Sequence, residues 1–235
     1  MSSTQTPQVN QILKTLGNET INKFFPDLEL VELDLGNVLY ESGERLSHVY
    51  FPTSAIISLL YVMENGSSAE IAVVGNEGML GVSMFMGGDT TPSRAVVQSS
   101  GYGYRVKINQ LKDGFEHNPD TMHVLLKYTQ ALMTQITQTA VCNRHHSIDQ
   151  QLCRWLLLSL DRLETNQLKM TQELIANMLG VRREGVTEAA GKLQKSGLIK
   201  YSRGLIEVLD RQGIEEKCCE CYQVVKDEYD RLLPQ

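Results

Sequence analysis

The stretch that decides the fold is TQELIANMLGVRREGVTEAAGKLQKSGLIKY, residues 171–201 of a 235-residue chain. Thr171 is a good N-cap for a first helix through Leu179, because its side-chain oxygen can accept a hydrogen bond from the first turn. Gly180 follows and can take the left-handed conformation that a tight turn requires. A second helix is expected from about Arg183 to Ser196. The stretch therefore predicts two short helices joined by a turn.

Small and apolar residues at matched positions indicate how these two helices would pack. Ala176 is small enough to let the second helix approach closely, and Val186 would fit between the two helices. Ile175 and Leu179 would line the same core. Such a tight helical pair is typical of a helix-turn-helix.

Polar residues gather at the start of the second helix, and a basic hairpin follows it. The outward positions are Arg182, Arg183, Glu184, Thr187 and Glu188, with Lys192 and Lys195 further along. The segment GLIKYSRGLIEVLD, residues 197–210, is typical of a two-stranded hairpin around Ser202, Arg203 and Gly204. An ordinary pair of core helices does not usually combine these features. The pattern therefore favours a winged helix-turn-helix that binds DNA.

The N-terminal half has the pattern of an antiparallel β structure. From about Leu28, short segments rich in β-branched and aromatic residues alternate with turn-forming clusters such as ENGSS and MGGDTTP. Regularly punctuated short strands predict a sandwich or a barrel.

A long helix is expected between the two halves. Residues 119–146 contain no glycine and no internal proline, and Pro119 suits a helix start. Leu125, Leu132, Ile136 and Ala140 recur at intervals of seven, four and four. This apolar stripe would suit pairing with a second copy of the chain. The alternative is that the stripe packs on the β structure of its own chain, and pairing is favoured.

The composition limits the class of protein. The net charge is −6 and the pI is about 5.4, so any DNA contact must come from a local basic patch. No apolar run approaches the roughly 20 residues of a membrane span. The first residues lack the pattern of a secretory signal. We therefore expect a cytoplasmic protein without a membrane partner.

The five cysteines are expected to be free thiols. In the CCEC segment, residues 218–221, Cys218 and Cys221 fall on the apolar face of a helix expected from about Arg211 to Leu232. Cys219 points elsewhere and is the candidate reactive thiol. Cys142 and His146 would share a helix face as metal ligands or as part of a polar hinge, and the hinge is favoured. No second ligand pair at zinc spacing is nearby, so no metal site is assigned.

The whole layout resembles the cyclic-AMP receptor protein/FNR (Crp/Fnr) family of bacterial transcription regulators. The resemblance covers residues 18–210 and is strongest in MTQELIANMLGVRREGVTEAAGKLQKSGLIKYSRGLIEVLD, residues 170–210. It implies an α+β fold with an N-terminal cyclic-nucleotide-binding-like β-roll (a double-stranded jelly roll), a long dimerisation helix and a C-terminal winged helix-turn-helix. It also implies a homodimer on a palindromic operator, with double-stranded DNA and RNA polymerase as partners.

The expected boundaries follow the changes of pattern. Residues 1–117 would form the sensor domain, residues 118–146 the dimerisation helix and hinge, and residues 147–235 the DNA-binding domain.

By the same resemblance, Arg183 and Glu184 stand where the family places its base-reading residues. An arginine can bind O6 and N7 of guanine, and a glutamate can accept from N4 of cytosine. Where family members often carry a second arginine, this chain has Glu188. We therefore expect a half-site different from the usual one. The expected phosphate contacts are Lys192, Lys195, Lys200 and Arg203.

The effector pocket departs from the pattern of cyclic-nucleotide binders. Ser93 and Arg94 would correspond to the phosphate-binding pair, and Thr137 on the long helix would reach the pocket. Gly81, however, is followed by Val82 and Ser83, with no glutamate to hold the ribose. The resemblance therefore implies an effector site at Gly81, Ser83, Ser93, Arg94 and Thr137, but a cyclic nucleotide is not expected there. An unidentified small molecule, or no ligand, is favoured.

Two other function classes are weighed against a regulator. One is a ligand- or redox-sensing protein whose C-terminal domain binds another protein. The other is an enzyme, for which the sequence offers no nucleophile with a paired base, no Walker loop and no dinucleotide fingerprint. Neither is favoured.

Overall fold

The computed structural model describes residues 6–88 and 90–233, and its N-terminal half contains two antiparallel sheets. One sheet has the order β1-β7-β3 and the other the order β2-β6-β4-β5. The strands are β1 (Glu29–Leu33), β2 (Val38–Tyr40), β3 (His48–Pro52), β4 (Ile56–Val62), β5 (Ser68–Val74), β6 (Arg94–Ser99) and β7 (Gly101–Lys107). Three short helical segments, η2 (Pro7–Val9), α1 (Gln11–Phe24) and η3 (Val82–Met84), accompany them. The predicted antiparallel β structure is confirmed.

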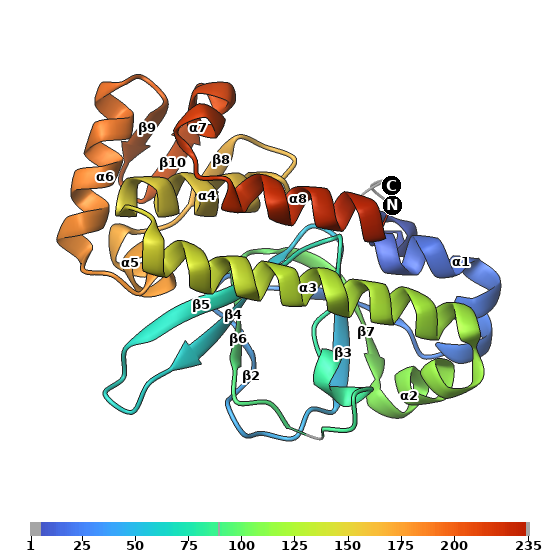
Figure 1. Cartoon of the computed structure of the whole chain (residues 1–235). Coiled ribbons are helices and arrows are strands. Elements are labelled where there is room, and N and C mark those ends of the chain that lie inside the picture. The colour runs from blue at the N-terminus through green and yellow to red at the C-terminus, as the bar shows by residue number, and fades with distance from the viewer. Residues whose placement is uncertain (1–5, 89, 234–235) are drawn as a thin grey trace.

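The long helix is α3 (Pro119–His145), which follows α2 (Ile108–His117). Asn118 caps α3 by accepting a hydrogen bond from Thr121 N, and Pro119 occupies its first turn as expected. In Figure 1 α3 lies across the strands, with the last helix of the chain beside it.

The C-terminal half begins with α4, whose start at Ser147 forms a capping box with Gln150. Its elements are α4 (Ile148–Leu160), β8 (Gln167–Lys169), α5 (Gln172–Leu179), α6 (Arg183–Lys195), β9 (Ile199–Ser202), β10 (Leu205–Val208), α7 (Arg211–Lys217) and α8 (Cys221–Leu232). The hairpin β9–β10 is extended by β8 into a three-stranded sheet. The single helix expected from Arg211 to Leu232 is wrong, because the chain breaks between Lys217 and Cys221.

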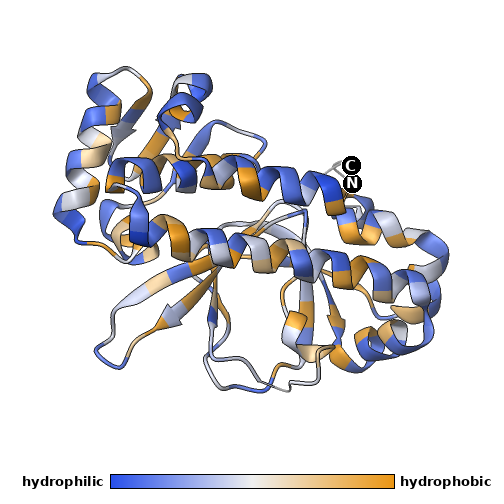
Figure 2. Cartoon of the chain, in the orientation of Figure 1, coloured by the Kyte–Doolittle hydropathy of each residue, from blue (hydrophilic) through white to orange (hydrophobic). Residues whose placement is uncertain are grey.

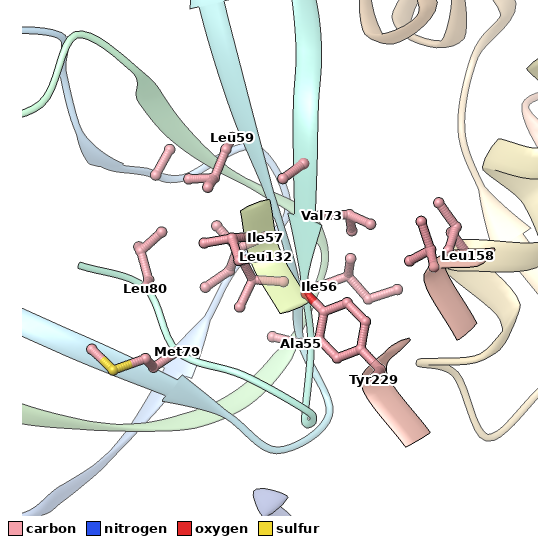
Figure 3. Close-up of a cluster of buried hydrophobic side chains, with 14 of the residues drawn as sticks. Ala55, Ile56, Ile57, Leu59, Val73, Met79, Leu80, Leu132, Leu158 and Tyr229 are labelled. Carbon is pink, nitrogen blue, oxygen red and sulfur yellow. The ribbon is translucent and has the colours of Figure 1, made fainter. Parts of the chain in front are cut away.

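One continuous hydrophobic core joins the two halves. Figure 3 shows side chains of the central strands meeting Leu132 of α3, Leu158 of α4 and Tyr229 of α8. The Gln135 amide accepts from Val73 N at 2.7 Å and donates to Val73 O at 3.2 Å, so it satisfies the edge strand β5 as a neighbouring strand would. It also donates to the Tyr229 hydroxyl at 3.0 Å. Helices α3 and α8 are thereby attached to the β-roll.

The apolar stripe expected to pair with a second copy packs largely against its own chain, which is the alternative that the sequence left open. Leu125 and Leu132 are buried within their own chain, Ile136 is partly buried and Ala140 is exposed. The neighbouring side, about 100° further around the helix, exposes Leu126 (48%) and Met133 (61%), which are seven residues apart. Hydrophobic and hydrophilic residues are interspersed along α3 in Figure 2. The core of the chain therefore buries most of the predicted stripe, and a second stripe through Leu126 and Met133 stays exposed.

A chain of buried polar groups crosses the contact between the β-roll and α4. Ser58 Oγ lies 2.5 Å from Oε2 of Glu70 and 2.8 Å from Oε1 of Gln98, whose Nε2 donates to Ser159 Oγ at 3.0 Å. A hydroxyl has one proton, so Ser58 can donate to only one of these carboxyl and amide oxygens. A protonated Glu70 carboxyl can donate to Ser58 Oγ, which leaves the Ser58 hydroxyl proton for Oε1 of Gln98. Each contact in the chain then has one donor and one acceptor. Burial raises the pKa of Glu70 to about 7, against the opposing effects of the Ser58 hydrogen bond and the charges of Arg154 and Arg162.

Replacing Glu70 with glutamine should stabilise the protein at high pH. The folded state holds the Glu70 proton to a higher pH than the unfolded chain does, so wild-type stability falls as the pH rises from about 4.5 to about 7. The loss is about 3 kcal/mol once both states are ionised. Urea unfolding should therefore show that Glu70→Gln is more stable than the wild type by up to about 3 kcal/mol at about pH 8. At about pH 4 the two proteins should have nearly the same free energy of unfolding. A difference that stays constant with pH would mean that Glu70 does not carry the proton.

Candidate DNA-binding surface, effector residues and hinge cluster

The helix-turn-helix has the local geometry that its sequence predicts. Thr171 Oγ1 accepts a hydrogen bond from Leu174 N at 3.2 Å and caps α5. Gly180 has φ 65°, the left-handed conformation expected at the turn. Ala176 and Val186 are buried between α5 and α6, together with Ile175 and Leu179. The predicted pair of helices is confirmed.

The wing is a two-residue hairpin loop formed by Arg203 and Gly204. Their φ angles are 52° and 77°, as a type I′ turn requires at both central positions. Glycine adopts this conformation freely, whereas arginine adopts it at some cost. The turn places the Arg203 side chain at the exposed tip of the wing.

A groove separates α6 from the wing. Arg183 and Thr187 line it from α6, and Arg203 lines it from the wing. Gln172, Gln194 and Tyr201 also line it and were not predicted from the sequence. The Gln172 side chain accepts from the Thr187 hydroxyl at 2.7 Å, and that of Gln194 accepts from Tyr201 N at 2.7 Å. The interval of seven between Thr187 and Gln194 is the only sequence signal that could have identified Gln194.

The other predicted contacts at the N-cap of α6 and along this helix are exposed, outside the residues that line the groove. Arg182, Glu184, Glu188 and Lys192 are all exposed. Lys192 Nζ lies 3.0 Å from Glu188 Oε1 and 3.1 Å from Asp149 Oδ2, and hydrogen bonds to these two carboxylates raise its pKa. The positive charge of Lys192 is therefore paired with two carboxylates.

The β4–β5 hairpin contacts the turn of the helix-turn-helix. A Cβ atom placed on Gly180 would lie 3.1 Å from the Cβ of Ala69. Ser68 and Arg182 line the same shallow pocket between the two segments. The contact between the β4–β5 hairpin and the turn at Gly180 therefore offers a direct route by which a conformational change in the β-roll can reach α5 and α6.

The structure places the five predicted effector residues in or next to three elements, η3, β6 and α3. Gly81, with φ 108°, packs against Val49, and Ser83 lies next in η3. Ser93 is buried with its hydroxyl 2.9 Å from Thr91 Oγ1.

The remaining two predicted effector residues, Arg94 and Thr137, have partners of their own. Arg94 forms an ion pair with Glu41 at 3.1 Å. Thr137 is exposed, shares the outer face of α3 with Leu126 and Met133, and donates to Met133 O at 2.8 Å.

Two separate sequence segments meet at the hinge between α3 and α4. Cys142 and His146 end α3, and Cys219 and Cys221 lie at the break between α7 and α8. The prediction that Cys221 is buried is confirmed, whereas Cys219, expected to point away from the core, is buried at 5% exposure. Ligand atoms of these four residues all lie within 4.8 Å of one another, so the prediction that no second ligand pair lies near the CCEC segment is wrong. These four residues could hold a metal ion.

Within the described residues, no helix is both long and apolar enough to cross a membrane.

Comparisons with known proteins agree with this architecture. Residues 30–118 match the cyclic nucleotide-binding domain family, and residues 150–217 match the Crp-like helix-turn-helix domain family. The global nitrogen regulator of Synechococcus elongatus is 23% identical over 203 residues, which cover 81% of this chain and 90% of that protein.

Solved structures share the fold at low sequence identity. A Crp/Fnr-family transcriptional regulator from Eubacterium rectale matches with a TM-score of 0.69 and 19% identity, over 90% of this chain and 97% of that one. A CRP-family transcriptional regulator from Thermus thermophilus matches with a TM-score of 0.68 and 14% identity, over 80% of this chain and 95% of that one. With a cyclic-nucleotide-binding-type domain, a long helix and a Crp-like helix-turn-helix in this order, the chain belongs to the Crp/Fnr family of transcription regulators.

Proposed function

We propose that the protein acts in the cytoplasm as a homodimer that binds a palindromic operator. The observation that carries this proposal is the exposed groove between α6 and the wing, with Arg183 on one side and Arg203 on the other. In a winged helix-turn-helix the second helix enters the major groove of DNA. Arg183, at the start of α6, is then in position to bind guanine, and Arg203 to bind a phosphate.

The exposed residues of α6 divide into base-reading and phosphate-binding groups in this proposal. Glu184 would accept from cytosine, and Thr187 would contact a neighbouring base or phosphate. Arg182 would bind the backbone at the start of the helix. Lys192 can bind a phosphate only by leaving Glu188 and Asp149. The acid at Glu188 keeps this part of the surface from binding guanine, and so favours a half-site unlike the usual one.

The second copy would pair through the outer face of α3. Leu126, Met133 and Val141 are exposed there. Leu126 and Met133 are one heptad apart, which is the spacing that keeps side chains on the seam of two paired helices. Two copies paired in this way would present two α6 helices to successive major grooves, and the assembled dimer could then contact RNA polymerase.

The effector is proposed to be a small molecule other than a cyclic nucleotide. Arg94 is already paired with Glu41, so an incoming phosphate would have to displace a carboxylate. Val82 follows Gly81, and the glutamate that would hold a ribose hydroxyl is missing from this position. Binding near Gly81, Ser83, Ser93 and Arg94 would act on the DNA-binding domain through the β4–β5 hairpin, by favouring one of two placements.

Salt dependence tests whether the C-terminal domain binds DNA or another protein. Neutralising phosphates releases counterions, so a dimer with about 6–10 phosphate contacts should lose about 10³- to 10⁵-fold in affinity between about 50 and 200 mM salt. Fluorescence anisotropy of a labelled duplex, titrated with the full chain at several salt concentrations, measures this slope. An affinity that is unchanged by salt, or no binding at low salt, would favour the rival function in which this domain binds a protein.

A further inference from the structure

The hinge cluster consists of Cys142, His146, Cys219 and Cys221. The two α3 residues are one helical turn apart, and the two others flank Glu220 at the start of α8. One ligand atom from each of the four residues lies within 4.8 Å of all the others. Three thiols and one imidazole therefore converge on a single point from two segments that are far apart in the sequence: Cys142 and Cys219 are separated by 77 residues, and His146 and Cys221 by 75.

Two distances within the hinge cluster match the edges of a tetrahedral metal site, and all the others are within 4.8 Å. Zinc binds sulfur at about 2.3 Å and imidazole nitrogen at about 2.0–2.1 Å, so the edges of the tetrahedron are about 3.8 Å between two sulfurs and about 3.5 Å between sulfur and nitrogen. Cys142 Sγ lies 3.6 Å from Cys219 Sγ, and Cys221 Sγ lies 3.6 Å from His146 Nδ1. A disulfide would need about 2.05 Å between the sulfurs, so the thiols have the spacing of ligands rather than of a bonded pair.

The imidazole of His146 is oriented as a metal ligand by a carboxylate. Its Nε2 lies 3.4 Å from Oε2 of Glu220, while its Nδ1 faces Cys221. A proton on Nε2 directed at Glu220 leaves the Nδ1 lone pair facing the sulfurs. Carboxylates that hold the far nitrogen of a ligand histidine in this way are a recurrent feature of zinc sites.

Burial and charge around the hinge cluster also suit an anionic metal–thiolate centre. Cys142, Cys219 and Cys221 are all at most 5% exposed. Arg154 is buried on α4 and donates a hydrogen bond to the Thr139 hydroxyl at 2.7 Å. Its positive charge favours the thiolate forms of Cys142 and Cys221. Three thiolates and a divalent cation have a net charge of −1, which this guanidinium offsets.

We propose that Cys142, His146, Cys219 and Cys221 bind one thiophilic divalent metal ion of the zinc class in tetrahedral coordination. On binding, three thiols lose their protons to solvent and their sulfurs bond to the ion, and His146 binds through the Nδ1 lone pair without proton loss. The ion would fasten the end of α3 and the hinge before α4 to the start of α8. It would thus fix where the DNA-binding domain stands relative to the long helix.

Titration of the wild-type chain with Co²⁺ tests the site directly. The full chain is reduced and stripped of metal with a chelator, and Co²⁺ serves as the spectroscopic probe in place of zinc. We expect saturation at one Co²⁺ per chain, with sulfur-to-cobalt charge-transfer bands and the intense visible bands of tetrahedral coordination, and displacement by one equivalent of Zn²⁺. Spectra without thiolate bands, or octahedral ones, would overturn the proposal whatever the variants do.

Single substitutions then identify the ligands. Cys142→Ser and Cys219→Ser should abolish the thiolate spectrum or weaken metal binding strongly, whereas Cys153→Ser, a matched control at a buried thiol outside the four ligands, should retain it. Glu220→Gln should weaken binding about 10- to 100-fold, because it alters only the group that orients His146. Circular dichroism checks that each variant is folded. A folded Cys142→Ser with unchanged Co²⁺ affinity and spectrum would exclude this ligand set. If the chain binds no Co²⁺ and mild oxidation forms a disulfide between Cys142 and Cys219, the cluster is a redox site and not a metal site.

Discussion

Replacing Arg183 with alanine should lower the affinity for the operator by about 30-fold to 10⁴-fold without unfolding the protein. Arg183 is exposed at the start of α6 and lines the groove beside the wing, so its loss leaves no cavity in the core. A bidentate contact to guanine contributes about 1–3 kcal/mol of discrimination, and a dimer makes the contact in both half-sites. The total of about 2–6 kcal/mol corresponds to the stated range of affinity. Operator titrations at fixed salt measure the change.

Two further variants separate base reading from simple charge. Arg183→Lys keeps the charge but loses the two parallel hydrogen bonds, so it should retain non-specific binding and lose most of the sequence preference. Arg231→Ala removes an exposed arginine from α8, away from the helix-turn-helix, and should leave operator affinity unchanged. If Arg183→Ala reduces affinity no more than Arg231→Ala does, Arg183 does not contact DNA.

Replacing both Leu126 and Met133 with glutamate should convert the dimer into a monomer and abolish specific binding. Both side chains are exposed on the outer face of α3, where each glutamate would be buried without a partner in a paired helix. A monomer contacts one half-site, so its affinity should fall to the non-specific level, at least about 10³-fold below that of the dimer. Analytical ultracentrifugation and operator titration measure the two effects together.

The matched control for this pair is Leu35→Glu. Leu35 is 45% exposed in the turn between β1 and β2, so the substitution adds a glutamate, one charge rather than two, at an apolar surface position away from α3. This variant should remain dimeric and bind the operator as the wild type does. A Leu126→Glu, Met133→Glu protein that stays dimeric would place the second copy on another face.

The helix-turn-helix can be predicted from sequence because its determinants are local. Thr171, Gly180 and Val186 act within about 16 residues, through a cap, a left-handed turn and a packed contact. The wing follows from the same kind of information, since Arg203 and Gly204 are adjacent and form the whole turn. Strand β8 was not predicted, because three residues are too few to show a periodic pattern.

The face of α3 and the hinge cluster depend on contacts between distant segments. Helical spacing identified a stripe through Leu125 and Leu132, but only the packed β-roll decides which stripe it covers. Cys142 and Cys219 are 77 residues apart, and spacing within either segment cannot bring them together. Extending one helix from Arg211 to Leu232 also turned Cys219 outward, whereas the break before Cys221 turns it into the core.

The central claim is that two copies of α6 read a palindromic operator. Selection of duplexes from a random pool on the purified full-length chain tests it most directly. We predict enrichment of an inverted repeat whose half-site centres lie about one helical turn, roughly 34 Å, apart. Enrichment of no sequence, or of a single site without two-fold symmetry, would contradict the claim.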